Sequence, residues 1–325
     1  MRRKRIREFD MMEEMAGEMN TDKCCIAKDV EAVVTSFNQG TMLLEAVRSL
    51  CCQTTLPSRI FIVDDGSTDE KSVNILNDIK ASLDTPVPIV VIRQANCGVS
   101  AARNTGIRRT KAPMVLVLDG DDRLEPTYIE QVSCLLRSNP SAVGASSWMR
   151  TFGALEASVC PTGGGAADFL VRNCCPAAHI FRREIWEQCG GYDESMRSGF
   201  EDWDFFLSML ETMPEACIEI VREPLIDYRT APASANVKSM SKRLELMRFI
   251  IEKHINLYRE HITDVILGIE AVSMSRLDGW ECEMLHTLTE KRALSSVSKD
   301  FMEQPTYGDG GMAAAVRIAS FLGKE

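Results

Sequence analysis

The sequence has few residues that could bind zinc. Its 325 residues include only four histidines, and these do not lie at metal-ligand spacing. The 12 cysteines form no Cys-x-x-Cys motif and are scattered, apart from the adjacent pairs Cys24-Cys25, Cys51-Cys52 and Cys174-Cys175. A zinc site is therefore not expected, and the cysteines fit reduced thiols in the cytosol.

Long apolar runs and clustered positive charge are also lacking. No run is long enough to cross a bilayer, and no signal peptide is recognisable. The formal net charge is -10 without a basic stripe, which argues against nucleic acid as a partner. We therefore expect a cytoplasmic protein that contacts a membrane at most peripherally, at its inner face. An acidic protein that binds an anionic nucleotide would need a divalent cation between them.

Strands and helices alternate over the first part of the chain. Strands are expected at 30–36, 60–63, 89–92 and 114–118, separated by helices at 42–52, 67–82 and 100–110. This alternation predicts an α/β fold with a Rossmann-like, mostly parallel sheet flanked by helices. A further helix is expected from Glu201, and the chain after Ser241 reads as a helical C-terminal extension. Residues 1–22 are charged and rich in methionine, which predicts a solvated tail.

Two of the predicted strands end in clustered carboxylates. The first run is Phe61-Ile-Val-Asp-Asp-Gly-Ser-Thr-Asp69, and the second is Met114-Val-Leu-Val-Leu-Asp-Gly-Asp-Asp122. Crowded carboxylates repel one another, so such a cluster indicates a bound cation, a polar ligand, or both. Ligands of open α/β sheets bind outside the carboxyl ends of the strands. The turns therefore predict a metal-assisted site for a phosphorylated ligand.

Two further segments complete a set of four. They are Val33-Val-Thr-Ser-Phe-Asn-Gln-Gly40 and Asn96-Cys-Gly-Val-Ser-Ala-Ala-Arg-Asn-Thr-Gly106. The order and spacing of the four segments resemble those of the family 2 glycosyltransferases, which are inverting enzymes with the GT-A fold. Later motifs extend the resemblance to about Arg229: Gly190-Gly-Tyr-Asp-Glu194, Phe200-Glu-Asp-Trp-Asp204 and Pro224-Leu-Ile-Asp-Tyr-Arg229. The resemblance divides the chain into the tail 1–22, a GT-A catalytic domain 23–235 and a helical extension 236–325.

The resemblance implies a role for each motif residue in binding a nucleotide-sugar donor. The implied donor-binding residues are Thr35, Phe37, Asp65, Arg103 and Asp119. Thr35 and Phe37 would line the nucleotide pocket, Asp65 would accept a hydrogen bond from the base, and Asp119 would contact the ribose or the sugar. Arg103 would hold the nucleotide through Asp65 or the phosphates, with a purely structural ion pair as the alternative. Asp64 would support its turn.

The resemblance also implies a metal and a catalytic base. Asp121 and Asp122 would hold Mn²⁺ or Mg²⁺ on the donor diphosphate, and the spacing leaves open which of them is the direct ligand. Asp202, beside Glu201, would act as the base that deprotonates the acceptor; the alternative is that it only caps a helix. Many relatives carry a histidine after the Tyr-Arg pair. No histidine follows Tyr228-Arg229 closely, so a third metal contact is in doubt.

The sequence therefore predicts a metal-dependent inverting glycosyltransferase that moves a sugar, from a UDP-sugar by default, to an acceptor hydroxyl. The acceptor is left open among saccharide, lipid-linked and other hydroxyl compounds. The alternative from another class is a non-catalytic module that binds a sugar nucleotide or a protein partner. A nucleotidyltransferase is disfavoured because the loop Ser36-Phe-Asn-Gln-Gly40 has no Lys or Arg. A dinucleotide-dependent oxidoreductase is disfavoured because no G-x-G-x-x-G follows a strand.

Overall fold

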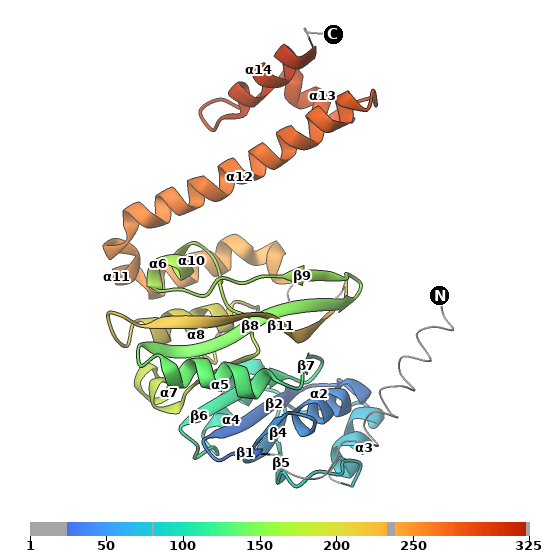
Figure 1. The fold of residues 1–325 in the computed structure, drawn as a ribbon, viewed down its shortest axis with the longest axis vertical. Helices are drawn as coiled ribbons and strands as arrows, with labels where there is room; N and C mark the ends of the chain where they lie inside the picture. The colour runs from blue at the N-terminus through green and yellow to red at the C-terminus, as the bar shows by residue number, and fades with distance from the viewer. Residues whose placement is uncertain (1–24, 80, 233–237, 323–325) are drawn as a thin grey trace. The chain divides into compact units, whose positions relative to one another are not determined.

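The computed structural model describes residues 25–79, 81–232 and 238–322, and the chain forms two compact units (Figure 1). The first unit comprises Met1–Phe169 and Asn173–Lys253, and the second comprises Leu170–Arg172 and His254–Glu325. The domain boundaries expected from the sequence, 23–235 and 236–325, stay predictions. The tail expected over residues 1–22 lies outside the described residues. No helix in the described ranges is long and apolar enough to pass through a membrane.

The first unit holds all the strands that the structure describes. They are β1 (Cys25–Ala27), β2 (Val30–Ser36), β3 (Thr55–Pro57), β4 (Ile60–Asp64), β5 (Ile89–Arg93), β6 (Met114–Asp119), β7 (Arg123–Leu124), β8 (Ala142–Gly153), β9 (Ala157–Val159), β10 (His179–Arg182) and β11 (Cys217–Thr230). Its helices are α2 (Thr41–Cys51), α3 (Glu70–Asp78), α4 (Val99–Ile107), α5 (Tyr128–Ser138), α6 (Ala166–Val171, which ends in the second unit), α7 (Arg183–Cys189), α8 (Glu201–Leu210), the 3-10 turn η1 (Met240–Lys242) and α10 (Arg243–Lys253).

Among the described residues, nine strands form one mixed sheet in the order β5-β4-β2-β6-β10-β8-β11-β7, with β9 paired to β8. The four strands expected from the sequence, β2, β4, β5 and β6, form its parallel half. The predicted GT-A architecture is confirmed. The second half is mixed: β10 runs antiparallel to both β6 and β8, whereas β11 is parallel to β8. The description "mostly parallel" therefore holds for the half built from the first 119 residues.

Strand β2 explains why the strands of the parallel half are apolar runs in the sequence. All seven of its residues are buried, because a parallel sheet has helices on both faces. Its one buried carboxylate, that of Glu31, accepts hydrogen bonds from the backbone N–H groups of Lys111 and Ala112. A buried charge is tolerated when it is paired in this way.

Helix α3 begins later than the sequence indicated. The expected start at Ser67 is wrong: Asp69 is the N-cap residue, and its carboxylate accepts a hydrogen bond from Ser72 N at 2.8 Å. Ser67 serves the preceding turn instead, because its hydroxyl accepts a hydrogen bond from Asn38 N at 2.8 Å. This bond joins the loop after β2 to the loop after β4, so both strand ends are held together.

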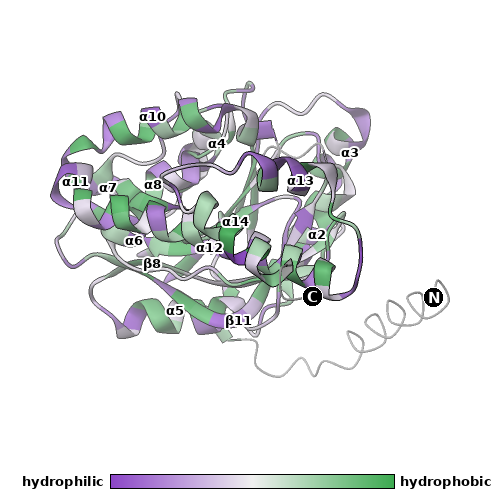
Figure 2. Ribbon diagram, turned by 90° about the horizontal axis from the view of Figure 1, so that it is seen from above, coloured by the Kyte–Doolittle hydropathy of each residue, from purple (hydrophilic) through white to green (hydrophobic). Residues whose placement is uncertain are grey.

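The second unit is helical, as expected for the C-terminal part of the chain. Its helices are α11 (Ile255–Glu260), α12 (Ile262–Thr289), α13 (Ser296–Glu303) and α14 (Gly311–Leu322). Helix α14 is drawn mostly in the colour of apolar residues (Figure 2). Arg317 of α14 makes two hydrogen bonds to the Glu281 carboxylate of α12, at 2.8 and 2.7 Å. Near the amino-terminal end of the unit, the Tyr258 hydroxyl donates to the carbonyl of Leu170 at 2.9 Å.

Gly106 allows helix α4 to pack closely on the parallel strands. A Cβ added there would lie 2.4 Å from Val33 Cγ1 and 3.1 Å from Val63 Cγ2. We expect Gly106→Ala to destabilise the first unit by roughly 1–3 kcal/mol, because the helix must move away from the sheet. Urea unfolding followed by circular dichroism measures this change.

Gly279 of α12 supplies the matched control. A Cβ added at Gly279 meets nothing within 4 Å. Gly279→Ala should therefore stabilise its helix by up to about 1 kcal/mol. Equal effects of the two substitutions would contradict the close packing of α4.

Candidate active site

The candidate site lies at the carboxyl ends of three adjacent strands, as the acidic turns predicted. In the sheet register Thr35 of β2 is paired with Asp119 of β6, and Ser36 of β2 is paired with Asp64 of β4. The Thr35 hydroxyl, which is buried, donates to Asp119 Oδ1 at 3.1 Å. Phe37, just beyond the strand, has 47% of its surface exposed, so its ring is free to contact a ligand.

The two aspartates of the first acidic turn have different surroundings. Asp64 is fully buried; its oxygens accept hydrogen bonds from Ser67 N and from Arg93 Nε, both at 3.1 Å. It therefore supports the turn. Asp65 Oδ1 accepts from Gln94 Nε2 at 2.8 Å and from Cys97 N at 2.9 Å.

The other oxygen of Asp65 is less occupied. Asp65 Oδ2 accepts from Gly98 N at 2.8 Å. A carboxylate oxygen has about two acceptor positions, so Oδ2 keeps capacity for a further donor. The carboxylate is thus held rigidly beside α4 and can still accept a hydrogen bond from a ligand.

Arg103 lies at the centre of the site. Its side chain is 2% exposed; Nη2 donates to both oxygens of Asp119, at 2.9 and 3.1 Å, and Nη1 donates to Glu201 Oε1 at 3.3 Å. Its guanidinium carbon also lies 5.2 Å from the centre of the Tyr192 ring. The guanidinium therefore joins the acidic turn after β6 to the start of α8. Its bonds run to Asp119 and Glu201 and none is made to Asp65, so of the alternatives left open by the sequence the structure contains the ion pair.

Gly120 allows the Asp-Gly-Asp-Asp turn to approach β2. A Cβ at this position would lie 2.3 Å from Gln39 Oε1 and 2.7 Å from the carbonyl oxygen of Thr35. After this glycine, Asp121 Oδ1 accepts from Gln39 Nε2 at 3.3 Å. Burial and the nearby Asp119 raise the pKa of Asp121 to about 6. The ionised carboxylate at this position is therefore destabilised relative to an exposed aspartate.

Asp122 has a structural partner that Asp121 lacks. Its Oδ1 accepts from Arg229 N of β11 at 2.8 Å, and the residue is only 3% exposed. Burial, followed by Asp121, raises its pKa well above the usual range. The Arg229 guanidinium donates to the carbonyl of Asp121 and to Glu45. Arg229 thus fixes the turn from the side of β11.

The predicted base is at the first turn of α8. Asp202 Oδ1 accepts from Trp203 N at 2.9 Å, and Oδ2 accepts from Asn173 Nδ2 at 3.3 Å. Burial raises the pKa of Asp202, while Arg103 acts to lower it. Burial and Asp202 raise the pKa of Glu201 to about 7, against the effect of Arg103. Arg103 therefore stabilises two carboxylates that would otherwise resist ionisation.

His179 is a core residue of the first unit. It is fully buried against the rings of Phe181, Phe205 and Phe206, and burial lowers its pKa to about 3. The neutral ring has Nδ1 2.7 Å from the carbonyl oxygen of Ala177.

Several site residues were not assigned a role from the sequence. Gln39, Gln94, Asn173 and Arg229 bond to the acidic residues from four different segments. Arg229 stands in a recognised motif, but Asn173 belongs to none. In the described ranges, no three side chains of His, Cys, Asp or Glu come together as a metal site.

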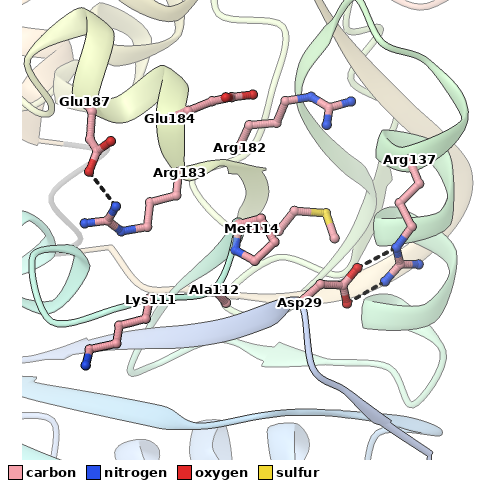
Figure 3. A pocket seen from close by; sticks show the side chains of 10 residues that line it. Asp29, Lys111, Ala112, Met114, Arg137, Arg182, Arg183, Glu184 and Glu187 are labelled. Carbon is pink, nitrogen blue, oxygen red and sulfur yellow. Dashed lines mark hydrogen bonds and ion pairs between the residues drawn. The ribbon is translucent and has the colours of Figure 1, made fainter.

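A pocket of about 370 Å³ lies at the opposite ends of the strands, beside Asp29 before β2 and Met114 at the start of β6 (Figure 3). Its three arginines are already engaged: Arg137 pairs with Asp29, Arg183 pairs with Glu187, and Arg182 donates to three backbone carbonyls. Lys111 and Arg183 extend to one side and Arg137 and Arg182 to the other. These diverging charges do not form a common anion site.

The mixed sheet, with its acidic turns at the carboxyl ends of the parallel strands, defines a glycosyltransferase of the GT-A class. Residues 31–189 match the model of glycosyl transferase family 2, and this part of the chain is a family 2 glycosyltransferase domain. Among solved structures, S. aureus TarS 1-349 in complex with UDP-GlcNAc has a similar fold, with a TM-score of 0.56 and 13% identity. That similarity covers 73% of this chain and 72% of the TarS chain.

Curated relatives agree with this assignment. The uncharacterized glycosyltransferase YwdF of Bacillus subtilis (strain 168) is 25% identical over 239 residues, which cover 69% of this chain and 84% of YwdF. An N-acetylglucosaminyltransferase of Azorhizobium caulinodans is 32% identical over 127 residues, covering 38% of this chain and 31% of that protein. The individual roles of the site residues stay predictions.

The raised pKa of Glu201 makes stability depend on pH. Its pKa is about 7 in the folded protein, whereas the pKa of a glutamate in an unfolded chain is about 4.3. Between these values the folded protein keeps a proton that the unfolded chain releases, so this group's contribution to stability falls as pH rises. Glu201→Gln cannot ionise. The free energy of unfolding of Glu201→Gln minus that of wild type should therefore increase from pH 5 to pH 8.

Urea unfolding at several pH values between 5 and 8 measures the difference. Glu215→Gln, at an exposed position after α8, is the matched control and should follow the wild-type curve. Parallel curves for wild type and Glu201→Gln would contradict the raised pKa.

Proposed function

We propose that this chain is a metal-dependent inverting glycosyltransferase that uses a UDP-sugar donor. The observation that carries the proposal is the buried Arg103, which links Asp119 beside the acidic turn to the carboxylate pair of α8. A donor bound over the strand ends would lie between these two groups. Because the similar TarS structure is a complex with UDP-GlcNAc, this nucleotide sugar is the first donor to test.

The donor would bind along the carboxyl ends of the strands. Phe37 offers an exposed ring to a base, and Asp65 Oδ2 can accept a hydrogen bond from the N–H edge of that base. Asp119 is held by Thr35 and Arg103, and its side chain is 27% exposed, so it can contact a ribose or sugar hydroxyl. These residues orient the donor without taking part in the chemical step.

Asp121 is the better candidate for the direct metal ligand. Asp122 is buried and already accepts from Arg229 N, whereas Asp121 has one long hydrogen bond from Gln39. The raised pKa of Asp121 fits a carboxylate that a cation would stabilise. Cations on a diphosphate need only one or two protein carboxylates, because phosphate oxygens and waters complete the coordination. A bound Mn²⁺ or Mg²⁺ would neutralise the charge that develops on the leaving diphosphate.

Asp202 is the proposed general base. As an ionised carboxylate, it would take the proton of the acceptor hydroxyl as that oxygen attacks the anomeric carbon. Arg103 and the N-terminal end of α8 favour the ionised form. The single displacement inverts the anomeric configuration. A binding module without catalysis is not favoured, because all the carboxylates that the family resemblance requires lie at this edge.

The acceptor is a hydroxyl compound, and saccharides and lipid-linked saccharides both fit the proposal. A lipid-linked acceptor would require the protein to contact a membrane peripherally.

The metal assignment predicts a loss of UDP binding in Asp121→Ala. With wild type, UDP plus Mn²⁺ should raise the thermal midpoint, since ligand at a hundred times its dissociation constant adds about 2.7 kcal/mol of stability. Asp121→Ala should lose the Mn²⁺-dependent part of this shift. Asp78→Ala, at an exposed position ending α3, is the control and should keep it. A full metal-dependent shift in Asp121→Ala would refute the assignment.

The base assignment predicts a different pattern for Asp202→Asn. This variant should keep the UDP–Mn²⁺ thermal shift and lose roughly 100- to 10,000-fold in turnover, the usual contribution of a general base. UDP release from UDP-GlcNAc, with water as the acceptor, measures the rate. Early ¹H NMR spectra should show the β-anomer of the released sugar. Loss of donor binding together with turnover would mean that Asp202 is structural.

A further inference from the structure

Asn173 is next to the proposed base and belongs to none of the sequence motifs. It follows helix α6, and its side chain is exposed, so it does not serve the core. Its Nδ2 lies 3.3 Å from Asp202 Oδ2, and its Oδ1 lies 3.1 Å from Cys175 N. One amide group therefore contacts both the carboxylate and the neighbouring backbone.

The contact with Cys175 fixes the direction of the amide. A backbone N–H can only donate, so the oxygen of Asn173 must face Cys175 N. The amide nitrogen must then face Asp202, where it donates to the carboxylate. If the amide were turned by 180°, both bonds would be lost: its nitrogen would face the N–H donor of Cys175, and its oxygen would face the acceptor Oδ2 of Asp202.

The other oxygen of Asp202 is also held. Asp202 Oδ1 accepts from Trp203 N at 2.9 Å, and the Trp203 indole donates to the carbonyl of Phe169 at 2.6 Å. This second bond anchors the start of α8 to the helix that precedes Asn173. With a donor on each oxygen, the plane of the Asp202 carboxylate is defined.

We propose that Asn173 is a positioning residue for the general base: its amide orients the Asp202 carboxylate and favours the ionised form. The inference rests on the proposed function of Asp202. A hydrogen bond donated to a carboxylate stabilises the charged form. Asn173 therefore holds Oδ2 in one direction relative to the acceptor and keeps the base ionised.

The charged and titratable groups that face Asp202 come from several elements. Glu201 is its neighbour on α8, Arg103 is on α4, Asp119 ends β6, and Tyr192 and Cys175 lie in flanking loops. Burial and Asp119 disfavour the ionised carboxylate, and Arg103 favours it. Because these effects oppose one another, one additional neutral hydrogen-bond donor, the Asn173 amide, can shift the ionisation equilibrium of Asp202.

The test compares Asn173→Ala and Asn173→Asp with wild type and with Asn77→Ala. Asn77, exposed on α3, is the matched control for an asparagine-to-alanine change. The pKa of Asp202 is read from ¹³C NMR of the carboxyl carbons, assigned with Asp202→Asn. Turnover is read as UDP release from UDP-GlcNAc between pH 5 and 9. Donor binding is read from the thermal shift with UDP and Mn²⁺.

We expect Asn173→Ala to raise the pKa of Asp202 by about half to one unit. Turnover on the acidic side should fall roughly 3- to 10-fold and partly recover at higher pH, with the UDP–Mn²⁺ thermal shift unchanged. Asn173→Asp, which keeps the shape and adds a like charge, should move the acidic limb further upward. Asn77→Ala should match wild type in every measurement.

Two results would overturn the inference: an unchanged pKa of Asp202 in both Asn173 variants, or a loss of turnover that is equal at every pH. A raised pKa of Asp202 without any change in the pH dependence of turnover would support the hydrogen bond from Asn173 to Asp202. It would contradict the role of Asp202 as the base. The failure of the inference is therefore distinguishable from the failure of the proposed function.

Discussion

The pairing of Nη2 of the buried Arg103 with both carboxylate oxygens of Asp119 is the interaction on which the site depends. A guanidinium with 2% exposure requires anionic partners, since an unpaired buried charge is very costly. Asp119 and Glu201 are also crowded by other carboxylates, so they require a cation. Removing one partner of such a buried pair costs about 3–5 kcal/mol. Each side of the site is thus stable only when the other is in place.

The fold brings these partners together from distant parts of the chain. Asp119 ends a strand of the parallel half, Arg103 is on the helix that packs on β2 and β4, and Glu201 begins a helix that lies between β10 and β11 of the mixed half in the chain. Strand β10 pairs with β6 and joins the two halves. The half that holds the acidic turns and the half that supplies the proposed base are therefore one sheet, and Arg103 connects them at its edge.

The sequence predicted the features that local pattern controls. Strands such as β4 and β6 are continuous apolar runs, and the clustered aspartates at their ends have few explanations other than a ligand site. The start of α3 was misplaced because Ser67 and Asp69 are both good caps, and only the bond from Asn38 N shows that Ser67 is engaged elsewhere. Asn173 and Gln39 could not be found, because an isolated amide gives no pattern and its partner is 29 or 82 residues away. The antiparallel pairing of β10 likewise depends on long-range contacts.

The division of the chain into units affects how the catalytic part could be isolated. Leu170–Arg172 belong to the helical unit, although they lie inside the sequence of the other unit and directly precede Asn173. The Leu170 carbonyl accepts its hydrogen bond from Tyr258. A truncation after Lys253 would remove Tyr258 and the rest of the second unit, to which these three residues belong. The two units therefore cannot be separated by a single cut in the chain. A shortened protein would also need substitutions at residues 170–172, which belong to the removed unit.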